Sequence, residues 1–125
     1  MKTAFSLIFI TLLFMGCSKK QNREDGPLIK GKLVRNLCVD PLVQILDSAY
    51  FSTGENWLDT STSDIGVLHD HIFTVDNPCD YSSRPLQVGD EFYFRITNES
   101  IDNCAVCAMF APSPATRHKI RVDNP

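Results

Sequence analysis

The segment Glu91-Phe-Tyr-Phe-Arg-Ile96 alternates polar and apolar side chains with a period of two residues. In an extended strand this period places alternate side chains on opposite faces of a sheet. We expect Phe92, Phe94 and Ile96 to point into a core and the polar residues between them to point outward. The turn Gln87-Val-Gly-Asp90 comes directly before the segment. The pattern therefore predicts a β-strand with one buried face.

Other segments rich in β-forming residues extend this prediction along the chain. Five further short strands are expected at 28–36, 42–46, 71–75, 105–110 and 118–122. Gly31, inside the first of them, indicates a bulge or a sharp bend. No stretch keeps a helical period over three turns, and the best helix candidate is a short turn near 79–83. The predicted fold class is all-β.

The N-terminus predicts the compartment. A short cationic start is followed by an apolar run at 4–15, which is too short for a lasting transmembrane helix but suits a secretory signal peptide. The run ends in Leu13-Phe14-Met15-Gly16-Cys17, which resembles a bacterial lipobox, although Phe14 departs from the aliphatic residue usual there. The resemblance implies that Cys17 is acylated and that its lipid chains hold the protein on a bilayer. An ordinary signal peptide with a chance cysteine is the alternative.

The segment after Cys17 is polar and charged and is expected to be a flexible tether. The predicted organisation is a lipoprotein signal peptide over 1–16, an acylated flexible tether over 17–27 and a single small β-barrel domain over 28–125. Ser18, rather than an aspartate, follows the cysteine. This favours the outer membrane of a bacterial envelope, on its periplasmic or its surface face.

The body resembles a five- or six-stranded OB-like barrel. The resemblance covers about 28–122 and depends on strand spacing and on the stretches Gly31-Lys-Leu-Val34, Val88-Gly-Asp-Glu-Phe92 and Cys104-Ala-Val-Cys107. The same pattern resembles small Bacteroidetes-type envelope lipoproteins, which carry such a domain behind a lipobox. An immunoglobulin-like sandwich is the structural alternative, but the strands are too few and the Cys…Trp…Cys spacing is absent. OB folds commonly bind oligonucleotides or oligosaccharides, although a fold alone does not determine function.

Charge and motifs exclude several function classes. The 125 residues carry a net charge of −3, and without residues 1–16 there are 11 Lys and Arg against 15 Asp and Glu. An acidic exported domain is not expected to bind nucleic acid. The sequence holds no nucleophile elbow, zinc-protease motif, phosphate loop or dinucleotide fingerprint. We therefore predict a protein that is not an enzyme and that needs no cofactor.

Four cysteines remain after Cys17, namely Cys38, Cys79, Cys104 and Cys107. An even number in a small exported domain predicts two disulfides. If 104–107 is a strand, its two cysteines lie about 10 Å apart and cannot pair, because a bridge needs Cα atoms within about 7 Å. Each would then pair with Cys38 or Cys79, whereas a turn at 104–107 would allow them to pair with each other. A redox-active pair and a zinc site are the alternatives to structural bridges.

Two further groups are candidate binding residues. His69 and His71 share a face if the segment is extended, and this spacing suits a weak metal site, although two histidines at a barrel rim are the alternative. The polar segment 48–66 is expected to be an irregular loop, yet it carries Tyr50, Phe51 and Trp57. Aromatic rings there would stack on sugars or fill a partner's pocket. The alternative is that Trp57 caps one end of the barrel.

Together these features predict a membrane-anchored bacterial envelope lipoprotein. It would be a non-enzymatic binding or structural module whose partners are the bilayer, through acylated Cys17, and an envelope protein or a glycan. The sequence leaves its oligomeric state open. One alternative is a thiol-redox or metal-binding protein that uses Cys104 and Cys107. Another is a small inhibitor of a cell-wall hydrolase.

Overall fold

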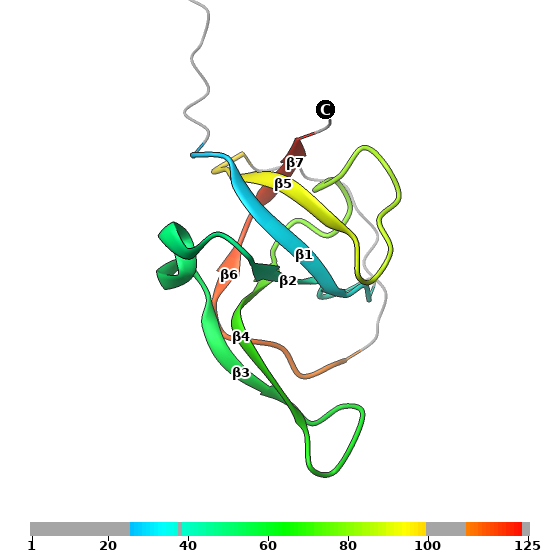
Figure 1. Cartoon of the computed structure of the whole chain (residues 1–125). Coiled ribbons are helices and arrows are strands. Elements are labelled where there is room, and N and C mark those ends of the chain that lie inside the picture. The colour runs from blue at the N-terminus through cyan, green and yellow to red at the C-terminus, as the bar shows by residue number, and fades with distance from the viewer. Residues whose placement is uncertain (1–25, 38, 100–109, 124–125) are drawn as a thin grey trace, which may run out of the picture.

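The computed structural model describes residues 26–37, 39–99 and 110–123, and it confirms the all-β class. Seven strands and one short 3-10 helix account for its regular structure (Figure 1). They are β1 (Ile29–Arg35), β2 (Leu42–Ile45), η1 (Ser48–Thr53), β3 (Glu55–Asp59), β4 (Val67–Val75), β5 (Glu91–Ile96), β6 (Arg117–His118) and β7 (Ile120–Asp123). No helix within the described ranges is long and apolar enough to cross a membrane.

All seven strands belong to one sheet. Its order is β3-β4-β2-β1-β5-β7, and β6 joins as a branch beside β4. Every pairing is antiparallel except that of β4 with β6. The sheet is not closed into a barrel, so the barrel part of the predicted fold is not confirmed. The strand number also exceeds the predicted five or six, because β3 was not predicted and the last strand is divided into β6 and β7 at Lys119.

The core lies on one face of this sheet, as the alternation in β5 predicts. Phe94 is fully buried and Phe92 nearly so, whereas Tyr93 between them is half exposed. The rings of Phe73 and Phe94 pack with centroids 5.6 Å apart. Around them lie aliphatic side chains from the other strands, namely Ile29, Leu33, Val43, Ile45, Val75, Ile120 and Val122. Burial of this apolar surface provides the main stabilisation of the body.

Gly31 has a different role from the one predicted. The register of β1 with β2 runs through Gly31 without a break, and the irregularity lies between Leu33 and Arg35. A Cβ atom at Gly31 would lie 2.7 Å from the Phe94 ring and 2.9 Å from Val43. Such distances are well inside van der Waals contact, so the glycine is needed for close packing in the core rather than for a bulge.

Two further predictions about elements need correction. The segment 48–66 is not an irregular loop, because it contains η1, which the Asp47 side chain caps, and β3. Strand β4 begins at Val67 rather than at residue 71. The short turn expected near 79–83 is confirmed, since residues 78–80 form a turn. The predicted strand at 105–110 lies outside the described residues except for Phe110, which is exposed.

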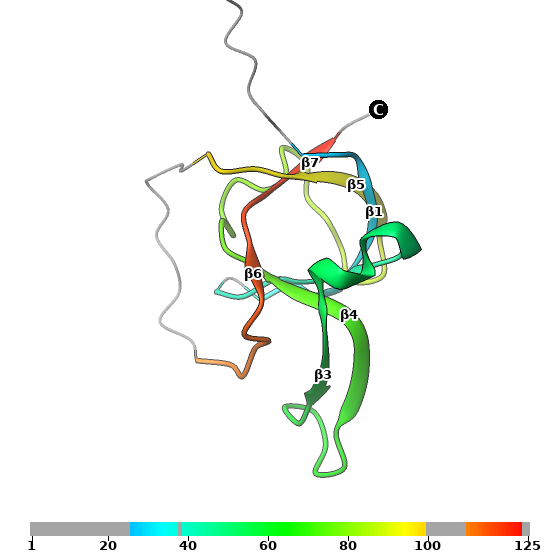
Figure 2. The same ribbon diagram turned by 90° about the vertical axis from the view of Figure 1, so that its left-hand side faces the viewer.

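The β3–β4 hairpin extends away from the rest of the sheet. Figures 1 and 2, which view the molecule from directions 90° apart, both show this hairpin at the end opposite the start of β1 and the end of β7. Its tip is therefore far from the point where the chain enters the domain.

Candidate functional site

The β3–β4 hairpin has two different faces. Leu58 pairs with Leu68, and the neighbouring pair on the same strands is Trp57 with His69. Residues directly opposite each other in an antiparallel pair share a face, and successive residues point to opposite faces. The hairpin therefore carries an aliphatic face at Leu58 and Leu68 and an aromatic face at Trp57 and His69.

The tip of the hairpin exposes aliphatic side chains. Leu58 is 50% exposed, Leu68 64% and Ile65 90%. We call these three residues the tip patch; Val67, which is 47% exposed, pairs with Asp59 and so belongs to the opposite face of the hairpin. Of the eight exposed large hydrophobic side chains in the described ranges, four belong to this hairpin. Scattered apolar residues are normal on a surface, but a group at the end of one projecting element is typical of a contact site.

The turn at the tip is held by its own hydrogen bonds. The buried Asp59 carboxylate accepts hydrogen bonds from the Ser61 backbone N–H, at 2.8 Å, and from its hydroxyl. The N–H of Gly66 donates to the Ser63 carbonyl at 3.1 Å, and Gly66 has a φ of 76°, which favours glycine. Burial raises the pKa of Asp59, but the hydrogen bonds from Ser61 and the charge of Arg35 outweigh it, so the pKa is lowered overall.

The root of the hairpin is the end nearest η1, where Gly54 and Glu55 lie beside His71 and Ile72. It packs against η1. The Phe51 and His71 rings stack with centroids 3.8 Å apart and planes 2° from parallel. His71 has a φ of 55° at a point where the register of β3 with β4 shifts. A Cβ atom at Gly54 would lie 2.5 Å from the His71 carbonyl carbon, so only glycine allows this approach. The His118 ring nitrogen Nε2 lies 2.8 Å from the Thr53 carbonyl oxygen and ties the same turn to β6.

A carboxylate joins the hairpin to the segment before β6. Glu55 accepts hydrogen bonds from the backbone N–H groups of Ala115, at 3.2 Å, and Thr116, at 2.8 Å, and from the Thr116 hydroxyl. The Thr116 hydroxyl has the largest influence and, with the two backbone donors, lowers the pKa of Glu55, although partial burial raises it. The ionised form of Glu55 is therefore part of what holds the hairpin in place.

The aromatic face is covered by an arginine. The Arg35 guanidinium carbon lies 5.7 Å from the centre of the Trp57 ring, and the His69 ring stacks at 6.4 Å. Arg35 also donates to the Pro112 carbonyl at 2.7 Å, while its Nε is buried without a hydrogen-bond partner. Burial lowers the pKa of Arg35 although the charges of Asp59 and Asp40 raise it. Trp57 is half-buried in this cluster and lies outside the hydrophobic core, so it does not cap the core.

The other predicted binding residues are Tyr50, Phe51, His69 and His71. Three of them lie near the root of the hairpin, and His69 lies on its aromatic face. Tyr50 and Phe51 are half-buried and pack against the core. His69 and His71 each stack on an aromatic ring, and the register shift beside His71 interrupts the alternation that would place them on one face. Within the ranges given above, no group of three or more His, Cys, Asp or Glu side chains is arranged to hold a metal ion.

Only one of the predicted cysteine sites lies in the described part of the chain. Cys79 is exposed and is disulfide-bonded. Cys17, Cys38, Cys104 and Cys107 lie outside the described residues. The connectivity of the disulfides, the acylation of Cys17 and any redox role of the pair at 104 and 107 therefore remain predictions.

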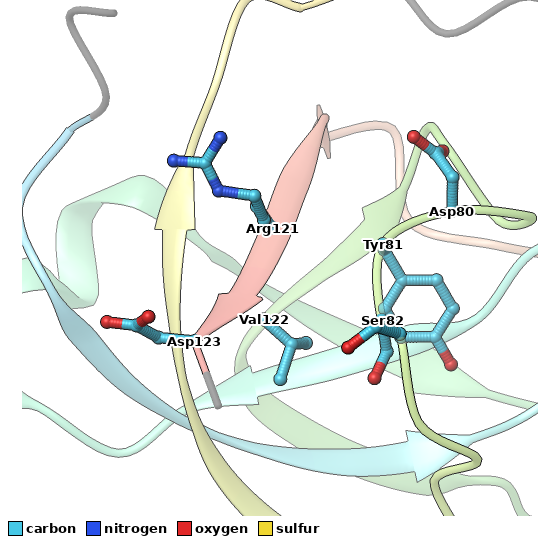
Figure 3. Close-up of a pocket in the computed structure, with 7 residues that line it drawn as sticks. Asp80, Tyr81, Ser82, Arg121, Val122 and Asp123 are labelled. Carbon is cyan, nitrogen blue, oxygen red and sulfur yellow. The ribbon is translucent and has the colours of Figure 1, made fainter. Parts of the chain in front are cut away.

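A shallow pocket lies beside the turn that carries Cys79 (Figure 3). Its volume is about 530 Å³, and Tyr81 and Val122 line it together with the charged residues Asp80, Arg121 and Asp123. The Tyr81 hydroxyl donates to the Asn36 side chain at 3.3 Å, and burial raises the pKa of Tyr81. The Ser82 hydroxyl donates to the Arg84 carbonyl rather than to a base.

The chain matches no known family model, no curated protein and no solved structure. The tip patch is a feature of the folded molecule that the sequence alone does not predict. The signal for the hairpin itself is present: a polar turn rich in Ser and Thr separates Trp57-Leu-Asp59 from Val67-Leu-His69.

Proposed function

We propose that this protein is a membrane-anchored lipoprotein of the bacterial envelope that binds an envelope protein or a glycan through the β3–β4 hairpin, without catalysis. The observation that carries the proposal is the rigid, projecting hairpin with exposed aliphatic residues at its tip. Connecting segments on a fixed scaffold often carry function, and grouped apolar side chains on a surface mark contact sites. The acylated Cys17 would hold the protein at the membrane, and the hairpin lies at the end of the domain opposite the start of β1 (Figure 1).

An OB-like arrangement of the sheet is part of the proposal. The segment 117–123 bonds to β4 through β6 and to β5 through β7, with only Lys119 between the two strands. The Thr74 N–H donates to the Thr116 carbonyl and the Thr97 N–H donates to the Lys119 carbonyl, both at 2.9 Å. One segment that bonds to both sides in this way supports a barrel-like enclosure of the core.

Lipid attachment is tested by mass. The full-length protein and its Cys17→Ala variant are expressed with a labelled fatty acid, fractionated and weighed intact. We expect label and added acyl mass on the first protein only, in the membrane fraction. A soluble, unlabelled full-length protein would contradict this part of the proposal.

Binding is tested with the acylated protein as bait. Envelope proteins and purified envelope glycans are offered to the protein and to a variant in which Trp57→Ala and Ile65→Ser are combined. We expect at least one ligand to be retained by the parent protein and lost by the variant. The variant's thermal transition serves as the control for folding. If no protein or glycan is retained, or if the variant retains the same ligand, the hairpin is not the binding site.

A further inference from the structure

We infer that the tip patch docks into an apolar groove of a partner protein whose rim carries Lys or Arg side chains. The inference depends on the proposed function and names the chemistry of the partner. It is carried by the juxtaposition of exposed aliphatic side chains with unbalanced acidic charge on one rigid hairpin.

The first argument is the shape and polarity of the tip. Leu58 and Leu68 are a direct cross-strand pair, and a Cβ atom at Gly66 would meet the Leu58 side chain at 2.9 Å. The Leu58 side chain therefore packs over the turn instead of into the core. Ile65, next to Gly66, is almost fully exposed. Aliphatic side chains of this kind gain free energy when a partner removes them from water.

The second argument is charge. The segment 55–71 contains four acidic residues and no Lys or Arg. Glu55 is held by hydrogen bonds from Thr116 and Asp59 by hydrogen bonds from Ser61, whereas Asp64 and Asp70 are exposed on either side of the tip patch. A partner that covers the tip must therefore face uncompensated negative charge. Basic side chains at the rim of the groove provide the complementary potential.

The acidic charge of the hairpin also disfavours two other partners for the tip patch. A second copy of this chain would bring an equally acidic hairpin against the first, which opposes self-association. A bilayer with anionic lipids would repel the tip for the same reason, and the tip lies at the end opposite the start of β1, where the tether enters (Figure 2).

A glycan fits the tip less well than a protein groove does. Sugar rings stack on open aromatic faces, and Trp57 is half-buried beneath Arg35. The tip patch itself consists of aliphatic residues. An apolar protein groove is the environment that matches Leu58, Ile65 and Leu68.

The hydrogen-bonded turn at the tip favours docking into an apolar groove. The hydrogen bonds of Asp59, Ser61, Ser63 and Gly66 order the turn at the tip without any contact to another molecule. A contact element that is already ordered loses little conformational entropy on binding. The tip is therefore suited to insertion into a preformed groove.

The test is site-specific photo-crosslinking of the full-length, acylated protein in its own envelope. The photoreactive amino acid p-benzoylphenylalanine replaces Ile65 at the tip, Ser52 at the root of the hairpin, or Val88, an exposed aliphatic residue outside the hairpin. We expect a protein adduct from position 65 and none from position 88. The crosslinked site on the partner should lie among apolar residues flanked by Lys or Arg.

Variants at the tip, combined with the crosslinker at position 65, test each argument separately. We expect Leu68→Ser to reduce the adduct by about tenfold, since central contact residues dominate binding. Asp64→Asn with Asp70→Asn should reduce it by about threefold at low salt, and about 0.5 M salt should remove the difference. Val88→Ser and Glu91→Gln are the matched controls and should leave the yield unchanged. If Leu68→Ser changes the circular dichroism spectrum, Leu58→Ser replaces it in the comparison.

The remaining outcomes overturn the inference in distinguishable ways. A lipid adduct, an adduct with a second copy, a glycan adduct or an acidic crosslinked site at position 65 contradicts the stated partner. So does a yield that is unaffected by Leu68→Ser or by the aspartate changes. An adduct from position 52 alone overturns the inference but keeps the proposed function. Absence of adducts from both 52 and 65 overturns both.

Discussion

The body of the sheet and the β3–β4 hairpin are ordered by different forces. In the body, β1, β2, β5 and β7 turn apolar side chains into one core, where Leu33, Val43 and Phe94 are fully buried. In the hairpin, β3 has one buried residue, and that residue is Asp59. Order in the body follows from removal of apolar surface from water. The hairpin shares this only at the end of β4, where Phe73 and Val75 are buried in the core, and its projecting part is ordered by strand pairing, hydrogen bonds and ring stacking.

The contacts at the root explain why the hairpin is able to expose its apolar residues. Glu55, Phe51 and Gly54 fix the root of the hairpin, while Leu58 and Leu68 remain 50% and 64% exposed. These aliphatic side chains are therefore available to another molecule. The comparison predicts that substitutions in the two regions will have effects of different size and kind.

The largest effect is expected in the body. Phe94→Ala removes a fully buried ring that contacts Phe73, so we expect a loss of about 3–5 kcal/mol in the free energy of unfolding. Urea denaturation of the oxidised protein measures this loss. Tyr93→Ala, at the neighbouring half-exposed position, is the control and should cost much less. Equal losses at the two positions would show that the face assignment of β5 is wrong.

The next effect is expected at the root of the hairpin. Gly54→Ala would place a Cβ atom against the backbone of His71, which forces the hairpin to shift and costs about 1–3 kcal/mol. Backbone amide NMR shifts should change around His71 and Trp57 but not in β5. Ser52→Ala, an exposed neighbour in η1, is the control. Unchanged shifts in the hairpin would mean that the close approach of Gly54 to His71 is not real.

The same contrast explains how much of the molecule its sequence predicts. The alternation in β5 is visible because Phe92 and Phe94 on one face are buried and Ile96 on the same face packs against the core. Strand β3 has no such pattern, since Trp57 and Leu58 are adjacent and neither is part of the core. A strand that is stabilised by polar contacts has no hydrophobic period to reveal it.

The predicted site is incomplete for a related reason. The sequence predicts Tyr50, Phe51 and Trp57 as binding residues, because aromatic side chains in a polar segment favour contact with a ligand. However, Phe51 stacks on His71, and Arg35 lies over Trp57. These pairs are distant in sequence, so no local pattern reports them. The role of Gly31 is also hidden from the sequence. The glycine leaves space for the Phe94 ring, and the two residues become neighbours only in the folded sheet.

A smaller effect is expected at the contact between Glu55 and Thr116. Thr116→Val removes the hydroxyl donor and should cost about 1 kcal/mol near neutral pH. The pKa of Glu55 is lowered in the folded protein, so the unfolded state binds more protons in acid. The stabilisation is therefore present above the ordinary glutamate pKa of about 4.3 and is lost as the pH falls through the lowered folded value.

The measurement is urea denaturation of both proteins between neutral and acidic pH. The difference in stability between the parent protein and Thr116→Val should shrink toward zero in acid. Thr116→Ser keeps the hydroxyl and should behave as the parent does. A difference that stays constant with pH would show that the Val variant acts through packing rather than through the Glu55 carboxylate.

The smallest effect on stability is expected at the tip. Ile65→Ser changes a side chain that is 90% exposed, so the free energy of unfolding should change by less than about 0.5 kcal/mol. Val88→Ser, at an exposed aliphatic residue outside the hairpin, should be equally mild, and urea denaturation compares the two. A loss well above this limit for Ile65→Ser alone would mean that the tip is part of the hairpin's own packing. A mild effect at both positions, with photo-crosslinking confined to residue 65, would separate what the tip does for the fold from what it does for a partner.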